Sequence, residues 1–228
     1  MRRFIITGAP GAGKTTIIRQ LERDGFSVVE EAATDVIAAA YAQGTVQPWA
    51  HPSFIDAIAH LQKDRQIRAS CQPDEVQFHD RCAVCTAALA VHLGYPFSPF
   101  LASELERIKK EAIYQNRVFF IRNLGFVTPT EARRISFEDT VRFEKIHEET
   151  YRDFGFELVS LEPGSVVERV GIMKAAISNQ RQKPAPAEIG KRSPCPGTRV
   201  RCARSQGYRI CPPLAQKSHR LFPWAKSD

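Results

Sequence analysis

Short apolar runs alternate with amphipathic stretches between residues 3 and 178. The runs are rich in Phe, Ile and Val, which is typical of buried strands. The stretches between them show helical spacing of apolar residues, and several end at a glycine. The predicted strands are 3–7, 26–30, 76–79, 118–121 and 156–161. The predicted helices are 15–22, 32–42, 54–69, 83–93, 101–115, 136–151 and 165–177.

Regular alternation of strand and helix favours one fold class. Each helix between two parallel strands makes a right-handed crossover and covers one face of the sheet. The pattern therefore predicts an α/β fold, a three-layer domain with a five-stranded parallel sheet that occupies residues 1–178.

The last fifty residues, 179–228, lack this periodicity. They contain eleven Lys or Arg against two acids, seven of the fifteen prolines and three of the six cysteines. This composition predicts a disordered basic tail. Two alternatives remain open. The segment could be a basic arm that binds phosphates or acidic lipid, or it could be a stretch translated out of frame after a frameshift.

The distribution of charge limits the choice of partners. The whole chain carries +7, but residues 1–178 carry −2, so we do not expect the folded part to bind nucleic acid. Apolar stretches are too short for a membrane span, and the start of the chain lacks a signal-peptide pattern. We therefore expect a cytoplasmic protein with reduced cysteines.

A glycine-rich segment between the first predicted strand and the first predicted helix is the most specific motif. It fits G-x-x-x-x-G-K-[ST] and lies where a phosphate-binding loop must lie. Glycines allow backbone N–H groups to surround phosphate oxygens, and the following helix adds the positive end of its dipole. In such a loop Lys14 contacts the β- and γ-phosphates, and the Thr15 hydroxyl is a ligand of Mg²⁺. The residues expected to bind the nucleotide are Gly8, Ala9, Pro10, Gly11, Ala12, Gly13, Lys14, Thr15 and Thr16.

A carboxylate at the end of a neighbouring strand usually completes a magnesium triphosphate site. Asp80, after the strand 76–79, is the best candidate. It is predicted to hold Mg²⁺ through water or to accept a proton from a substrate hydroxyl, and the alternative is a helix N-cap. Arg81 beside it could pair with phosphate or with an acid.

Missing motifs separate three classes of phosphate-loop protein. The chain has neither the N-K-x-D element nor the D-x-x-G element of switch GTPases. It lacks the D-E pair of ring-forming motors, because Asp80 is followed by Arg81, and 178 ordered residues leave little room for their extra helical domain. A small-molecule kinase remains.

The long motifs also resemble a known family. The phosphate loop, the segment 29–37, Asp80-Arg81 and the segment 118–138 are similar to bacterial AAA-type ATPases whose phosphate-loop domain is related to nicotinamide-riboside kinases. The resemblance covers residues 3–178. It implies a nucleoside-kinase-like fold that binds ATP, or alternatively GTP, together with Mg²⁺.

The resemblance also implies roles for individual residues. Glu31 would be the acid near a substrate hydroxyl, Asp80 and Arg81 would be the kinase-type pair, and Arg133 and Arg134 would be arginines of a lid. A structural ion pair or cap remains open for Glu31, and a solvated helix face for the two lid arginines. Cys82 stands where such proteins more often have serine.

The remaining candidates are interpreted as structural. Cys82 and Cys85 have the spacing of a metal-binding pair, but buried small apolar side chains are the preferred interpretation. Trp49 and Phe54 could close a flap, although core packing is preferred. No histidine is assigned a catalytic role.

Two hypotheses of function follow from the sequence. The first is an ATP-binding enzyme that uses Mg²⁺ to transfer the γ-phosphoryl group to a small, nucleoside-like hydroxyl acceptor, or to water. The second is a nucleotide-dependent regulatory or interaction protein with no small-molecule acceptor.

Overall fold

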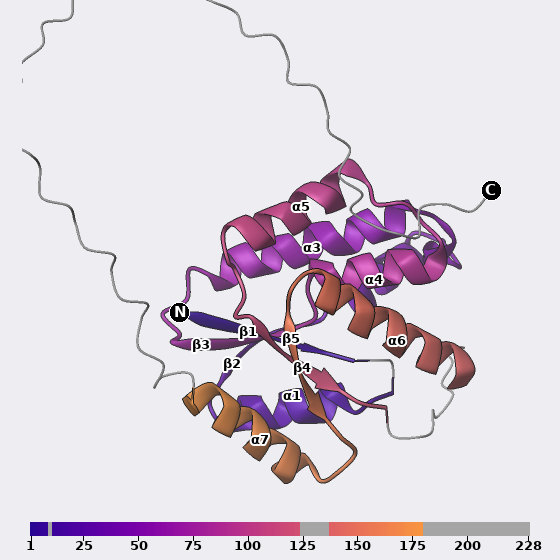
Figure 1. The fold of residues 1–228 in the computed structure, drawn as a ribbon. Helices are drawn as coiled ribbons and strands as arrows, with labels where there is room; N and C mark the ends of the chain where they lie inside the picture. Colours follow the sequence, from indigo (N-terminus) through magenta and orange to yellow (C-terminus); the bar gives the residue numbers. More distant parts are fainter. Residues whose placement is uncertain (9–10, 124–136, 180–228) are drawn as a thin grey trace, which may run out of the picture. The chain divides into compact units, whose positions relative to one another are not determined.

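Five parallel strands form one sheet in the order β2-β3-β1-β4-β5, so the predicted sheet is confirmed (Figure 1). The computed structural model describes residues 1–8, 11–123 and 137–179. Ile6 of β1 pairs with Asp80 of β3 and with Phe119 of β4, so the strand ends lie side by side at one edge. The strands are β1 (Arg2–Thr7), β2 (Ser27–Val29), β3 (Val76–Asp80), β4 (Arg117–Ile121) and β5 (Glu157–Leu161).

Helices cover both faces of this sheet, as the three-layer prediction requires (Figure 1). Two of them, α1 and α7, pack on one face, and α3, α4, α5 and α6 lie over the other. The helices are α1 (Lys14–Arg23), α2 (Ala33–Ala42), α3 (Ser53–Ala69), α4 (Ala83–Leu93), α5 (Pro99–Lys110), α6 (Phe137–Asp153) and α7 (Val166–Asn179), with a short 3-10 helix at Pro48–Ala50.

The core on the α1 and α7 face is built around three phenylalanines from adjacent strands. Phe4, Phe78 and Phe119 are fully buried, and their ring centroids are 5.8 to 6.1 Å apart. Such tilted pairs add to the free energy of burying the rings themselves. This packing fixes the central strands, and with them the sheet edge that carries the site.

Helix α5 ends at Lys110, five residues before the predicted end at Gln115. Ala112 adopts a left-handed backbone conformation with φ 46°, and the Ile113 N–H donates to the Ile108 carbonyl at 3.2 Å. This backbone closure terminates a helix. The turn buries Ile113 in the core, a tertiary contact that helical spacing does not reveal.

Helix α7 begins with a reciprocal cap that the sequence analysis did not identify. Ser165 Oγ accepts from the Glu168 N–H at 3.2 Å, and Glu168 Oε2 accepts from the Ser165 N–H at 3.0 Å. Ser136, where the sixth predicted helix begins, lies outside the described residues.

The chain divides into two units, Met1–Pro184 and Ala185–Asp228, and only the first contains described residues. The tail predicted for 179–228 therefore lies almost entirely outside them. Within the described ranges, no helix combines the length and apolar character needed to cross a membrane.

Candidate functional site

The predicted phosphate loop connects β1 to α1 and begins at a glycine that no other residue could replace without strain. Gly8 has φ 143°, and a Cβ there would lie 2.2 Å from the carbonyl oxygen of Ile121. Gly13, with φ 85°, precedes the first residue of α1. Ala9 and Pro10 lie outside the described residues.

Lys14 is the first residue of α1, and its side chain is buried against the loop. Its Nζ donates to the Gly8 carbonyl at 3.1 Å, and the residue is 9% exposed. Burial and the neighbouring Arg81 lower the pKa of Lys14 to about 7. Thr15 and Thr16 are exposed, so their hydroxyls are accessible to a ligand.

Arg81 follows the last residue of β3 and points back to the same loop. Its Nη2 donates to the Gly8 carbonyl at 3.0 Å, so one carbonyl oxygen accepts from both Arg81 and Lys14. The backbone of Arg81 has φ 71°, which is uncommon for a side chain of this size. Its N–H donates to the Ile6 carbonyl at 3.0 Å and holds this conformation beside β1.

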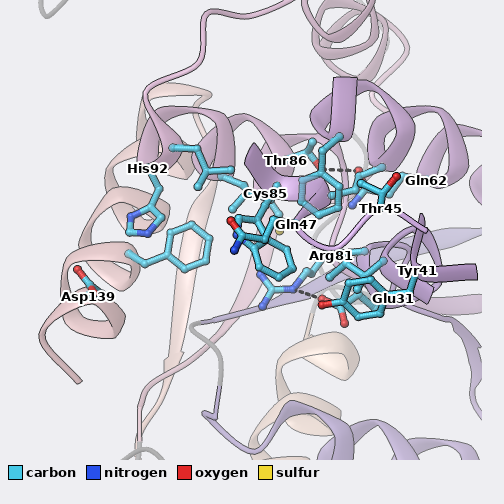
Figure 2. A pocket seen from close by; sticks show the side chains of 18 of the residues that line it. Glu31, Tyr41, Thr45, Gln47, Gln62, Arg81, Cys85, Thr86, His92 and Asp139 are labelled. Atoms are coloured by element: carbon cyan, nitrogen blue, oxygen red, sulfur yellow. Dashed lines mark hydrogen bonds and ion pairs between the residues drawn. The ribbon is translucent and has the colours of Figure 1, made fainter. Parts of the chain in front are cut away.

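Glu31 pairs with Arg81 across the ends of β2 and β3 (Figure 2). Arg81 Nε lies 2.8 Å from Glu31 Oε1, and Thr34 Oγ1 donates to Glu31 Oε2 at 3.0 Å. Burial alone would raise the pKa of Glu31, but the charges of Arg81 and Lys14 and the hydrogen bond from Thr34 have the larger effect, so the pKa is lowered. Glu31 is therefore a carboxylate at neutral pH.

The pKa of Asp80 shifts in the opposite direction from that of Glu31. Burial raises the pKa of this carboxyl to about 6, although Lys14 and Arg81 oppose the shift. Its Oδ1 is buried and accepts no hydrogen bond from the part of the chain that the structure describes. An unsatisfied buried carboxylate oxygen beside a phosphate loop fits Mg²⁺ or a water bound to it, and the exposed Thr15 hydroxyl fits the same ion.

A cavity of about 900 Å³ opens beside the Glu31–Arg81 pair (Figure 2). Residues of α2, α3, α4 and α6 line it, together with the segment between α2 and α3. Tyr41, Trp49, Phe54 and Phe143 provide aromatic lining residues. The preference for core packing was therefore incomplete, since Phe54 lies both in the core and on the cavity, and Trp49 is 37% exposed on the cavity.

Several polar groups of the cavity lie on α3, α4 and α6. Thr86 Oγ1 donates to Gln62 Oε1 at 2.7 Å, which fixes the amide of Gln62 at the wall. His92 and Asp139 lie on another part of the lining (Figure 2). The cavity therefore combines flat apolar surfaces with a few fixed hydrogen-bonding groups, which suits a small organic ligand.

Buried polar side chains of α4 and α6 form a cluster next to Arg81, which was not predicted from the sequence. His147 Nε2 lies 3.3 Å from Arg81 Nη1, and Tyr151 OH lies 2.9 Å from Cys85 Sγ. Cys82 and Cys85 are buried, as predicted. Burial opposes ionisation of Cys85, but Cys82, His147 and Arg81 outweigh it and lower the pKa of this thiol well below its usual value.

Arg169 of α7 is a second residue that sequence reasoning missed. It is 4% exposed, and both terminal nitrogens donate to the Ala12 carbonyl at 3.4 Å. One of them also donates to the Leu161 carbonyl at 3.3 Å. The only sequence signal is a lone arginine in an apolar helix, which does not reveal that α7 passes behind the phosphate loop.

The structure thus brings Lys14, Glu31 and Asp80 to one sheet edge, around Arg81. Their roles stay predictions. Arg133 and Arg134 lie outside the described residues, so the structure does not show where the predicted lid arginines are.

The fold and the glycine-rich loop define a phosphate-loop NTPase domain. A family model described as an AAA domain matches residues 3–169, and the chain belongs to this family. No curated protein matches the sequence.

Solved structures share the fold at low sequence identity. Deoxyadenosine kinase from M. mycoides, with dCMP and dCDP bound, is 14% identical with a TM-score of 0.55, covering 78% of this chain and 99% of that chain. NadR protein in complex with NR is 18% identical with a TM-score of 0.58, covering 81% of this chain and 52% of that chain. NadR protein in complex with NAD and AMP-PNP is 19% identical with a TM-score of 0.54, covering 82% of this chain and 52% of that chain.

Replacing Gly8 by alanine tests how tightly the loop is held against β4. The new Cβ would overlap the Ile121 carbonyl, so we expect the free energy of unfolding to fall by about 3 kcal/mol. Gly44→Ala is the matched control, because Gly44 has φ 83° but a Cβ there would have no neighbour within 4 Å, and we expect a loss of about 1 kcal/mol. Urea unfolding measures both, and equal losses would contradict the close approach.

Proposed function

We propose that this protein transfers the γ-phosphoryl group of ATP to a hydroxyl group of a small, nucleoside-like acceptor bound in the cavity. The proposal rests on one observation: the Gly8 carbonyl accepts hydrogen bonds from both Lys14, at the end of the phosphate loop, and Arg81, which lines the cavity. The two sites therefore share one junction. Phosphoryl transfer needs such adjacency, since its catalysis consists mainly of positioning and charge neutralisation.

The nucleotide half of the site is proposed to bind the triphosphate of ATP on the residues from Gly8 to Thr16. Lys14 would move its ammonium from the Gly8 carbonyl to the β- and γ-phosphates. Thr15 and Asp80 would hold Mg²⁺, which neutralises charge on the phosphate oxygens when it is bound. The AAA-domain family and the structural neighbour bound to AMP-PNP support this assignment, and GTP is the alternative nucleotide.

The acceptor half is proposed to be the cavity, with Glu31 closest to the reacting hydroxyl. Glu31 is held as a carboxylate beside Arg81, so it can accept the hydroxyl proton as the oxygen attacks phosphorus. The aromatic lining suits a flat ring. Two structural neighbours, a deoxyadenosine kinase and a NadR protein bound to NR, support a nucleoside-like acceptor.

Arg133 and Arg134 are proposed to complete the site as cations that meet the phosphoryl group during transfer. The next described segment after them begins α6, whose Asp139, Arg142 and Phe143 line the cavity. That position in the chain supports a lid role.

Lys14→Ala tests the nucleotide half. Loss of a charged hydrogen bond to phosphate is expected to weaken ATP binding by about 2 kcal/mol, which is about thirty-fold. Isothermal titration calorimetry with Mg²⁺ measures the affinity, and the exposed Lys145→Ala is the control that should bind as the parent chain does. Unchanged affinity of the Lys14 variant would overturn the assignment of the loop.

Arg169→Met tests whether the cation behind the loop positions it. The Ala12 carbonyl would lose its donors, so we expect ATP binding to weaken about fivefold, corresponding to about 1 kcal/mol. Arg2→Met is the matched control, because Arg2 also donates to a carbonyl of α7, that of Ile177, but from the other end of β1. A fall in unfolding free energy with unchanged ATP affinity would show that Arg169 acts only in folding.

Glu31→Gln tests the acceptor half. Labelled ATP and Mg²⁺ are incubated with the protein and a panel of nucleosides and related metabolites, and transfer of label is measured. We expect transfer by the variant to fall about a hundredfold or more with ATP affinity retained, because a general base contributes about that much.

Glu30→Gln is the control for that experiment, since Glu30 is the adjacent and exposed carboxylate. Transfer by the control should be unchanged. Tight ATP binding without label transfer to any acceptor would contradict the kinase and favour the nucleotide-dependent regulator.

A further inference from the structure

Cys82 and Cys85 occupy the start of α4 in an arrangement compatible with a disulfide. Cys82 is the N-cap residue, and the Cys85 N–H donates to the Cys82 carbonyl at 2.9 Å. A turn of this kind brings the two Cα atoms within about 7 Å. Disulfides span Cα separations of about 4.4 to 6.8 Å, so little backbone movement separates the pair from a bond.

One hydroxyl group connects the two sulfur atoms. Tyr151 OH lies 3.4 Å from Cys82 Sγ and 2.9 Å from Cys85 Sγ, and Tyr151 is fully buried. The hydroxyl both donates and accepts, so it can carry a proton between the two thiols.

The two thiols differ in access. Cys85 is only 3% exposed, but it is one of the residues that line the cavity (Figure 2), whereas Cys82 is completely buried and does not line it. A small reagent in the cavity therefore meets Cys85 first. The Arg81 guanidinium and the His147 ring both interact with Cys85, and neighbours of this kind favour the nucleophilic thiolate.

We propose that Cys82 and Cys85 form a redox-active dithiol, which a small hydroperoxide entering the cavity converts to a disulfide. Cys85 is the attacking residue, and Cys82 is the resolving residue. The phosphoryl-transfer chemistry proposed above uses neither thiol.

The oxidation balances in two steps. The Cys85 thiolate attacks one peroxide oxygen, the O–O bond breaks, and the leaving oxygen takes a proton as water or alcohol while Cys85 becomes a sulfenic acid. The Cys82 sulfur then attacks Cys85 Sγ, the S–S bond forms and the S–O bond breaks. The hydroxyl leaves as water with the Cys82 proton, which Tyr151 OH relays, so the dithiol loses two electrons and the peroxide gains them.

The test uses the full chain with Cys71, Cys195, Cys202 and Cys211 replaced by serine, which leaves the proposed pair as the remaining cysteines. Hydrogen peroxide is added, and the intact mass is measured. We expect the mass to fall by two hydrogen atoms and dithiothreitol to restore it. An unchanged mass, or a gain of oxygen atoms without the loss of hydrogen, would overturn the proposal.

Single variants on the same background assign the two roles. Cys82→Ser should stop at the sulfenic acid of Cys85, which dimedone traps. Cys85→Ser should react with neither peroxide nor dimedone. Equal trapping in both variants would overturn the assignment of Cys85 as the attacking residue.

The chain with all its natural cysteines keeps the proposal testable if the variants do not fold. Trypsin cleaves after Arg81 and next after Arg107, so both cysteines fall in one peptide. That peptide should lose two hydrogen atoms after peroxide treatment and alkylation, and an alkylated peptide without this loss would overturn the proposal.

The disulfide is also expected to affect the site, a consequence that rests on the proposed function. Cys85 Sγ lies 3.1 Å from Thr7 Oγ1, and Thr7 precedes the phosphate loop. Peroxide should lower phosphoryl transfer several-fold in the parent chain, with recovery in dithiothreitol. A disulfide that forms without changing a measurable transfer rate would overturn this coupling, whereas absent transfer before oxidation would count against the proposed function alone.

Discussion

One carbonyl group, that of Gly8, holds the site together. It accepts a hydrogen bond from Lys14 Nζ at 3.1 Å and another from Arg81 Nη2 at 3.0 Å. Lys14 is the first residue of α1, and Arg81 directly follows β3. A neutral carbonyl cannot balance two buried cations, so the Lys14 ammonium and the Arg81 guanidinium depend on nearby carboxylates for the rest of their stabilisation. The Glu31 carboxylate, 2.8 Å from Arg81 Nε, supplies part of that stabilisation.

The two carboxylates near this junction behave differently because their surroundings differ. Glu31 faces the Arg81 guanidinium and the Thr34 hydroxyl, so its pKa falls. The Oδ1 of Asp80 lacks a donor among the described residues, and burial raises the pKa of this carboxyl to about 6. Carboxyl groups whose environments separate their pKa values are suited to different chemical tasks.

The sequence predicted those parts of the molecule that depend on short-range patterns. Alternating apolar runs identified all five strands of the sheet, and the glycine spacing located the loop before Lys14. Parallel strands place their carboxyl ends at one edge, which is why Glu31, Asp80 and Lys14 could be expected together. Their chemical roles could not be tested in this way, since spacing shows where a residue lies and not what it touches.

The features that the sequence did not reveal depend on contacts between distant segments. Arg169 meets the Ala12 carbonyl only because α7 packs beside α1, and the lone arginine carries no motif. Tyr151 reaches Cys82 and Cys85 only because α6 lies over α4. The end of α5 at Lys110 likewise follows from the burial of Ile113 in the core.

The same packing explains why chemistry gathers at the start of α4. The backbone of Arg81 is held at φ 71° by its hydrogen bond to Ile6, and this conformation sends its side chain back to the loop while Cys82 continues into the helix. Arg81 therefore faces the loop, Cys85 faces the cavity, and both are fixed by one short segment. A covalent bond between Cys82 and Cys85 would constrain the turn that directly follows Arg81 in the chain. A change in the state of the thiols would therefore reach the site along two routes, through Arg81, which precedes Cys82 in the chain, and through Thr7, whose Oγ1 lies 3.1 Å from Cys85 Sγ.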